Sequence, residues 1–314
     1  MKKNHTMAEN KEGVIVAHYG VAVDVLFSED NACRMIRVKR NSGHVVGDRV
    51  IVEEDVLTRL ERSSELSRMD ARGGIHIVGA NLDVLCIVIS CEPLPPPGFI
   101  DRAIVAARSS GLRPVLVINK SDLPCFAEYQ AAVQPVYRES VKIFSLSAED
   151  GTGLDTLSGF FSEGHRGVFV GPTGVGKSSI LNSLLPEIHL TTGEISETKK
   201  RGRNTTTVST LHILNGGGEL VDSPGFNDFG MVDISAQQLS AYFPGFEKAG
   251  MEKEGCRFRD CKHREEPDCK VIELVKHDQI NRDRYTIYLQ MLTEVEAFDT
   301  DPKYRERRHR RKKN

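Results

Sequence analysis

The segments "VINKSD" (117–122) and "GPTGVGKS" (171–178) decide the fold, because of the order in which they occur. The first is an apolar strand that runs into an N-K-x-D loop, which is typical of the guanine-binding loop of GTP-binding domains. Its four loop residues are Asn119, Lys120, Ser121 and Asp122. In an ordinary domain of that class the phosphate loop comes first, whereas here it follows the base-binding loop.

The phosphate-loop prediction rests on residues 167–185, "GVFVGPTGVGKSSILNSLL", which read as strand, glycine-rich loop and helix. Such a loop turns its backbone N–H groups toward phosphates at the positive end of the following helix. Lys177 is expected to reach the β- and γ-phosphates, and Ser178 to bind Mg²⁺. The predicted nucleotide contacts of this segment are Gly171, Pro172, Thr173, Gly174, Val175, Gly176, Lys177, Ser178 and Ser179.

Guanine selectivity is expected from Asp122, whose carboxylate can accept hydrogen bonds from the N1–H and the exocyclic amine of guanine. Adenine has no matching pair of donors, so the site is expected to reject ATP. A second loop that follows a strand, "SLSAEDGTG" (145–153), is expected to place Ser147 and Ala148 behind the guanine O6.

Two further segments have the character of switch loops. In "DSPG" (222–225), Asp222 would hold Mg²⁺ through water, and the Gly225 N–H would contact the γ-phosphate. In "RGRNTTT" (201–207), Thr206 would complete the magnesium shell. A plain threonine-rich loop is the alternative, and Thr205 and Thr207 remain open as the ligand.

These five elements occur in the order base, base, phosphate, switch, switch, which indicates a circularly permuted GTPase domain. Loop tips tolerate new chain ends, so the same sheet can still form. The runs "DVLCIVIS" (83–90) and "RPVLVINK" (113–120) are typical of buried parallel strands. A helical pattern (99–111) lies between them. We therefore expect a doubly wound α/β domain over residues 76–245.

Residues 13–54 consist of short strands separated by Gly, Asn and Asp, as in a small β-barrel. In "CRMIRVKR" (33–40), strand alternation places Ile36 inside and Arg37 outside. The outer face of this strand is then basic. It could bind a partner, or it could be an ordinary solvated surface. The polar residues 58–75 suggest a linker, so the barrel and linker together span 1–75.

The third region, 246–314, contains a cysteine cluster with the spacing C-x4-C-x-H-x5-C. Three thiolates and an imidazole form the closed tetrahedral set of a structural zinc site. The predicted ligands are Cys256, Cys261, His263 and Cys269. Surface cysteines that met by chance are the alternative. Residues 281–298 have the spacing of a helix that packs on a neighbour, and eight Lys/Arg between residues 303 and 313 suggest contact with nucleic acid or a solvated tail.

The bulk composition, 39% hydrophobic and 27% charged over 314 residues, is that of a globular protein without a membrane span. The polar N-terminus has no apolar stretch suited to a signal peptide, so we expect a cytoplasmic protein. Seven cysteines in a reducing compartment argue against disulfides. Those outside the cluster are expected to be packing residues, namely Cys33, Cys86, Cys91 and Cys125.

Taken together, these motifs resemble the ribosome small-subunit-dependent GTPase A family (RsgA, also called YjeQ). The resemblance covers nearly the whole chain and includes "NKSD", "SLSA", "GPTGVGKSS", "TTGEISETKKRGRNTTT", "DSPGF" and the cysteine spacing. It implies an N-terminal OB-fold, late maturation of the bacterial small ribosomal subunit, and GTP hydrolysis stimulated by that subunit. The family usually has His at Asn204, Ser at Thr173, and Gln or another polar residue at Pro172.

We therefore expect a monomeric GTPase that binds the small subunit and its rRNA, with one zinc ion and with Mg²⁺ accompanying GTP. The candidate catalytic residues are Lys177, Asn204 and Thr206. Phe226 stands where small GTPases place a water-orienting Gln, so Asn204 is the candidate for that role. The alternative is a non-catalytic rRNA-binding scaffold with a vestigial pocket, which the presence of Lys177, Ser178 and Asp222 disfavours.

Overall fold

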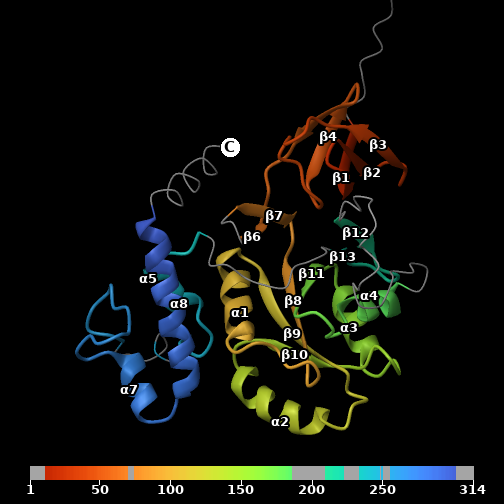
Figure 1. Cartoon of the computed structure of the whole chain (residues 1–314). Coiled ribbons are helices and arrows are strands. Elements are labelled where there is room, and N and C mark those ends of the chain that lie inside the picture. Colours follow the sequence, from red (N-terminus) through yellow and green to blue (C-terminus); the bar gives the residue numbers. More distant parts are fainter. Residues whose placement is uncertain are drawn as a thin grey trace, which may run out of the picture.

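The computed structural model describes residues 11–69, 74–185, 209–222, 233–247, 249 and 255–301. Three parts are visible in Figure 1: a group of N-terminal strands, a central sheet flanked by helices, and a C-terminal group of helices. Among the described residues, no helix has the length and apolar character needed to cross a membrane.

The N-terminal part is antiparallel, with the pairing order β3-β2-β1-β4-β5. Its strands are β1 (Lys11–His18), β2 (Ala22–Phe27), β3 (Cys33–Arg37), β4 (Arg49–Glu53) and β5 (Val56–Arg59). Alternate side chains form a separate apolar cluster of Ile15, Val23, Val25, Phe27, Ile36, Val50 and Val52. Ile36 is buried and Arg37 is exposed, so the predicted alternation in β3 is confirmed.

The central sheet is parallel over five strands in the order β10-β9-β8-β11-β13, and β12 pairs antiparallel with β13. These strands are β8 (Val84–Ser90), β9 (Arg113–Asn119), β10 (Lys142–Ser145), β11 (Arg166–Val170), β12 (Thr210–Ile213) and β13 (Glu219–Asp222). All seven residues of β8 are buried, as its continuous apolar run predicts.

Helices cover both faces of this sheet, and β8 shows how the sequence divides them. Leu85, Ile87 and Ile89 join the cluster that contains α1 (Phe99–Ser109) and α2 (Phe126–Tyr137). The intervening Val84, Cys86 and Val88 join the cluster that contains α3 (Leu154–Phe161) and α4 (Lys177–Leu184). Since successive strand residues point to opposite faces, one apolar run supplies both cores.

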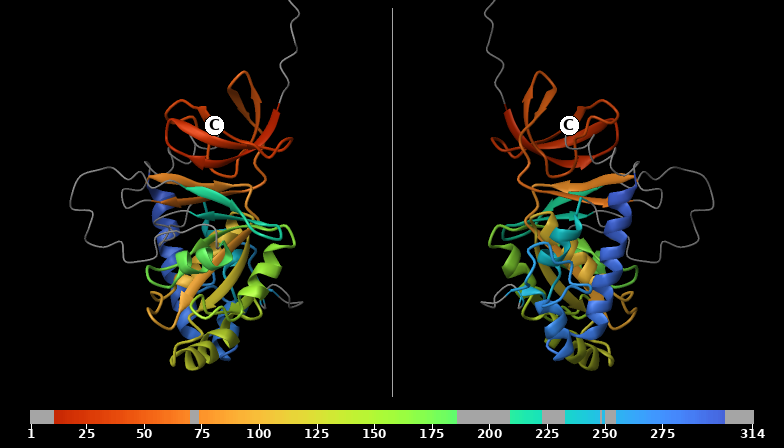
Figure 2. Two further views of the ribbon diagram at one scale, coloured as in Figure 1. Left: turned by 90° about the vertical axis from the view of Figure 1, so that its right-hand side faces the viewer. Right: turned by 90° about the vertical axis from the view of Figure 1, so that its left-hand side faces the viewer.

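The N-terminal strands join the central sheet through β1 and β12, where Ala17 is paired with Thr210. A separate two-stranded sheet of β6 (Glu65–Met69) and β7 (Ile75–Ala80) lies between the two parts (Figures 1 and 2). The prediction of a linker over 58–75 is therefore wrong for β6. Arg62, just before β6, pairs with the fully buried Asp48 at 2.6 Å and with Glu65 of β6 at 2.7 Å, so it ties β6 to the N-terminal strands.

The C-terminal helices are α5 (Ala236–Tyr242), α7 (Lys270–Lys276) and α8 (Arg282–Thr300). The predicted apolar stripe of α8 is confirmed, because Tyr288, Leu292 and Val295 are buried in the same cluster as α1. An ion pair fixes this contact: Arg284 donates to the buried Asp101 at 2.9 Å.

The cysteines outside the cluster differ from the prediction. Cys91 and Cys125 form a disulfide with an S–S distance of 2.03 Å, so neither is a free packing residue. Cys33 is exposed, and only Cys86 is a buried packing residue as expected. The pair was missed because the two cysteines are 34 residues apart and meet only when β8 and β9 become neighbours.

Candidate functional site

The loops that follow β9, β10 and β11 meet at the carboxyl edge of the parallel sheet, where doubly wound folds bind ligands. Together with the loop after β8, they border an open pocket of about 670 Å³. Its lining comprises Glu92, Pro93, Asn119, Lys120, Asp122, Leu123, Ala148, Glu149, Gly174, Gly176 and Ser179. Three predicted segments, "NKSD", "SLSA" and the phosphate loop, are therefore brought together around one space.

Asn119 holds these three segments to one another. Its side-chain Nδ2 donates to the Val175 carbonyl of the phosphate loop at 2.8 Å. Its Oδ1 accepts from the Ala148 N–H at 3.1 Å. The side chain is 2% exposed, so both bonds are shielded from competing water. Asn119 therefore fixes the positions of the phosphate loop and of the loop after β10 relative to the N-K-x-D loop.

Asp122 is an exposed residue in the lining of the pocket, and one oxygen of its carboxylate accepts a hydrogen bond from the protein. The Ser147 hydroxyl, which belongs to a fully buried residue, donates to Asp122 Oδ1 at 2.5 Å. The Ser121 N–H donates to the Leu146 carbonyl at 3.1 Å and joins the same two loops. These bonds orient a carboxylate toward the pocket, as recognition of a pair of N–H donors requires.

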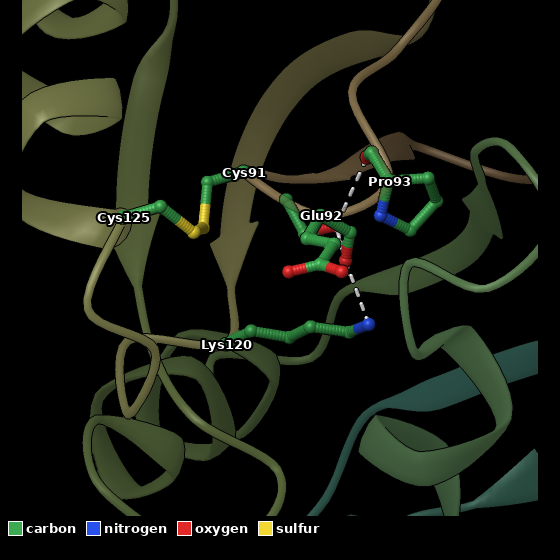
Figure 3. Close-up of a disulfide and its surroundings, with 6 residues drawn as sticks. Cys91, Glu92, Pro93, Lys120 and Cys125 are labelled. Carbon is green, nitrogen blue, oxygen red and sulfur yellow. Dashed lines mark hydrogen bonds between the residues drawn. A yellow bond between two sulfur atoms is a disulfide. The ribbon is translucent and has the colours of Figure 1, made fainter.

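Lys120 adopts a left-handed backbone conformation, with φ of 64°. Its Nζ donates to the Glu92 carbonyl at 2.7 Å, which lies in the loop after β8 (Figure 3). Glu92 and Pro93 line the pocket but were not predicted as site residues. Their position in the sequence could have identified them. They come just after β8, which is parallel to its neighbour β9, so they lie at the same edge of the sheet as the N-K-x-D loop.

Two positions of the phosphate loop require glycine, because neighbouring atoms leave no space for a Cβ. A Cβ on Gly171 would lie 2.3 Å from the Val88 carbonyl oxygen. One on Gly176 would lie 2.2 Å from Asn119 Nδ2, and the φ of Gly176 is 96°. The loop therefore packs directly against the end of β8 and against the base-binding loop, which fixes its position before any ligand enters.

Lys177 folds back over this loop, where its Nζ donates to the carbonyls of Gly171 at 2.6 Å and Pro172 at 2.8 Å. Burial lowers the pKa of Lys177 to about 8, against the opposing charge of Asp222. Burial also raises the pKa of Asp222. A cation kept in a desolvated position gains from an anionic ligand, which restores the charge interactions that burial removes.

The other predicted site residues fall into two groups. Ser178 and Ser179 lie in the first turn of α4, and Asp222 ends β13 at the same edge of the sheet. Thr173 belongs to the loop between β11 and α4. Several predictions lie outside the described residues: Asn204, Thr205, Thr206, Thr207, Gly225, Phe226 and the basic segment 303–313.

A second candidate site is formed by the predicted cysteine cluster. The ligand atoms of Cys256, Cys261, His263 and Cys269 all lie within 4.8 Å of one another. His263 Nδ1 is 3.4 Å from each of the three sulfur atoms, and two sulfurs are 3.9 Å apart. A tetrahedral ion with bonds of about 2.0–2.3 Å separates its ligands by roughly 3.5–3.8 Å. The cluster could therefore hold a metal ion.

The sheet order and the site define the class of protein. A phosphate loop after β11 and an N-K-x-D loop after the earlier strand β9 border one pocket, which is the arrangement of a circularly permuted GTPase. A family model described as RsgA GTPase matches residues 59–232. The chain belongs to the RsgA GTPase family, and it is a GTPase.

Curated relatives match over most of the chain. One from Pseudomonas fluorescens, named small ribosomal subunit biogenesis GTPase RsgA, is 37% identical over 303 residues and covers 92% of this chain and 87% of its own length. A relative of the same name from Pseudomonas aeruginosa is 35% identical, with coverage of 93% and 88%.

Two solved structures agree with this result. The crystal structure of YjeQ from Thermotoga maritima is similar with a TM-score of 0.74 and 28% identity, covering 91% of this chain and 99% of that one. The structure titled YloQ, a circularly permuted GTPase, gives a TM-score of 0.66 and 25% identity, with coverage of 96% and 99%. The predicted family and the permuted order are therefore confirmed.

Proposed function

We propose that this chain is an assembly factor of the small ribosomal subunit, which acts late in its maturation and hydrolyses GTP with stimulation by the subunit. The observation that carries the proposal is the bond from Asn119 to Val175, which joins the base-binding and phosphate loops around one pocket. The names of the curated relatives supply the small subunit as the partner.

In this proposal Asp122 reads guanine, with Ser147 and Ala148 beside the base. The glycine-rich loop and Lys177 bind the phosphates, and Gly225 contacts the γ-phosphate. Lys177 already lies inside the phosphate loop, held by two carbonyls that a phosphate can replace as its partners. The amine would thereby exchange neutral acceptors for charged ones, which strengthens each hydrogen bond.

Magnesium fits the same edge of the sheet. Ser178 at the start of α4 and Asp222 at the end of β13 supply oxygen ligands, with Thr206 as the third residue, and oxygen is what Mg²⁺ prefers. When bound with GTP, the ion would neutralise charge on the β- and γ-phosphates. Asn204 is proposed to orient the attacking water, because Phe226 has no hydrogen-bonding group.

The metal ion of the cysteine cluster is proposed to be zinc in a structural role. Three sulfurs and one imidazole are ligands that zinc favours, and four protein ligands leave no open position for catalysis. The Tyr285 hydroxyl donates to the His263 carbonyl at 2.7 Å, and the Tyr288 hydroxyl donates to the Lys262 carbonyl at 2.8 Å. Both bonds tie the cluster to α8.

The N-terminal part is proposed to be an OB-fold that contacts rRNA. Its pairing order β3-β2-β1-β4-β5 is that of a five-stranded barrel open between β3 and β5. Arg34, Met35 and Arg37 of β3 are exposed, which presents cationic groups beside an apolar one. With the zinc region and the basic tail, this strand would grip RNA, and GTP would favour the bound state. The domains are proposed at 1–75, 76–245 and 246–314, in a cytoplasmic monomer.

The scaffold alternative is not favoured, because the family and the pocket both indicate a GTPase. Phosphate release from GTP, measured with and without purified small subunits, tests the proposal. The chain alone should turn over at about 10⁻³ s⁻¹ or less, as GTPases do without their activating partner. Small subunits should raise this rate by at least roughly tenfold. Equal rates with and without small subunits, or equal stimulation by large subunits added as a control, would contradict the proposal.

A further inference from the structure

The disulfide Cys91–Cys125 brackets the base-binding loop. Cys91 is the first residue after β8, and Cys125 directly precedes α2. Ser90 and Asn119 form the last paired position of β8 and β9, so the bridge begins where the ladder between these strands ends. The N-K-x-D segment is thereby held on one side by β9 and on the other by the bridge.

The loop after β8, which begins at Cys91, lies beside Lys120 of this segment, as Figure 3 shows. The Glu92 carbonyl, next to Cys91, accepts from Lys120 Nζ at 2.7 Å and from the Ser90 hydroxyl at 3.0 Å. Glu92 and Pro93 form the wall of the pocket together with Lys120 and Asp122. A covalent bond between residues next to this wall therefore limits how far its two halves can separate.

Besides the bridge, the bond from Lys120 Nζ to the Glu92 carbonyl ties the loop after β8 to the base-binding loop, and the described contacts of both loops leave many of their side chains in solvent. Residues 92–94, 96 and 97 are exposed, Leu94 by 65%, and Asp122 and Pro124 are exposed as well. The strands themselves are held by a ladder and by buried cores on both faces, which do not depend on the bridge. Loss of the bridge is therefore expected to loosen the pocket wall while the sheet persists.

We propose that Cys91 and Cys125 form a thiol–disulfide switch of guanine nucleotide binding. In the bridged form the pocket wall is preorganised and nucleotide dissociates slowly. In the dithiol form the loop after β8 separates from Lys120, and nucleotide binds more weakly because binding must then order the loop. The inference rests on the nucleotide site of the proposed function and adds regulation to it.

The chemistry is thiol–disulfide exchange with a dithiol reductant. A thiolate of the reductant attacks the sulfur of Cys125, because Cys125 is only half-buried, whereas Cys91 is buried with 9% of its surface exposed. The S–S bond breaks, Cys91 leaves as a thiolate, and a mixed disulfide forms. The second thiol of the reductant releases Cys125, so two electrons and two protons pass to the protein and the reductant becomes a disulfide. A small-molecule disulfide reverses the reaction and leaves as two thiols.

A bridge of this kind suits regulation in a reducing compartment, where disulfides are usually transient and redox-sensing. The two sulfurs lie beside a ligand pocket rather than in one of the apolar clusters, and neither cysteine is a cluster member. The redox state of the pair would thus set nucleotide affinity without changing any side chain predicted to contact GTP.

Dissociation of fluorescent GDP from the full-length, zinc-loaded chain tests the switch. The protein is treated with glutathione disulfide or with dithiothreitol, and intact mass verifies the bridge. Reduction should accelerate dissociation about three- to tenfold. The double variant Cys91→Ser/Cys125→Ser should dissociate at the reduced rate under both conditions, and Cys33→Ser, an exposed cysteine far from the pocket in β3, should keep the switch.

Two outcomes would overturn the switch: equal rates for bridged and reduced wild-type protein, or failure of glutathione disulfide to form the bridge. Neither requires a variant to fold. A chain that binds no GDP in either state would instead contradict the proposed function, so the two failures are distinguishable.

Discussion

The side chain of Asn119 donates to the main chain of Val175 at 2.8 Å, across 56 residues of sequence. The bond joins the base-binding loop to the phosphate loop, although permutation has reversed their order in the chain. Gly176 fits beneath the same amide, with no room for a Cβ. The nucleotide site thus depends on strand neighbours in the sheet, which permutation preserves, and not on chain order.

Gly176→Ala tests this close packing. The new methyl would lie 2.2 Å from Asn119 Nδ2 in a backbone conformation that disfavours alanine. We expect GTP affinity to fall at least roughly tenfold, because the two loops must separate, as isothermal titration would show. Gly159→Ala, which meets open space in α3, is the matched control and should bind normally. Normal binding by both variants would contradict the packing argument.

Arg284→Met tests the contact between α8 and α1. It leaves Asp101, 1% exposed, without its cation and should cost about 3–5 kcal/mol of unfolding free energy in denaturant titrations. Arg102→Met removes the more exposed pair with Glu294 and should cost less than about 1 kcal/mol. Similar losses in the two variants would mean that burial does not control this contact.

The same variant has an expected pH dependence. Burial raises the pKa of Asp101, and the Arg284 guanidinium opposes that rise. Without Arg284 the folded-state pKa should lie further above the unfolded value, so the folded protein binds a proton more readily than the unfolded chain. The loss of unfolding free energy in Arg284→Met, relative to the wild type, should therefore become smaller as pH falls from about 7 toward about 5. A deficit that grows on acidification would refute this assignment.

Metal analysis should find about one zinc per chain. Cys261→Ser should lose it, because three ligands hold the ion far less tightly than four. Since metal binding and local folding are coupled, chelation should unfold the C-terminal helices and spare GDP binding. The exposed Cys33→Ser is the control and should retain the metal. Full zinc content in Cys261→Ser would exclude this residue as a ligand.

Asn204→Ala should bind GTP normally and lose most of the subunit-stimulated rate, by roughly a hundredfold if its amide orients the attacking water. Asn204→His should keep the stimulation, with a pH dependence near neutrality. Single-turnover hydrolysis on small subunits measures both. Unchanged stimulation in Asn204→Ala would mean that this residue only shapes its loop.

The buried strands and the pocket loops could be predicted because each signal is local. A continuous apolar run such as β8 identifies a strand covered on both faces, and the motif that follows a strand must lie at its carboxyl end. The metal cluster could be predicted for the same reason, since its ligands fall within 14 consecutive residues, 256–269.

Features that depend on distant partners could not be predicted. Arg284 meets Asp101 across 183 residues, and nothing in either segment marks the pair. Strand β6 carries Glu65, Ser67 and Arg68, so its sequence resembled a linker, and its strand conformation depends on pairing with β7. The Cys91–Cys125 bridge was excluded by compartment, an argument about average behaviour that says nothing about two cysteines at the ends of neighbouring loops.

The central claim is that Asp122 recognises guanine in the nucleotide pocket, and that the small subunit stimulates hydrolysis of the GTP bound there. Asp122→Asn removes a charged hydrogen bond of about 1.5–3 kcal/mol, so GTP should bind roughly ten- to a hundredfold more weakly. The new amide can donate to the 2-oxo group of xanthine. The decisive measurement is nucleotide hydrolysis by Asp122→Asn on purified small subunits. The account predicts that xanthosine triphosphate is turned over with stimulation while GTP is not. Stimulated GTP hydrolysis at the wild-type rate, with no use of xanthosine triphosphate, would contradict it.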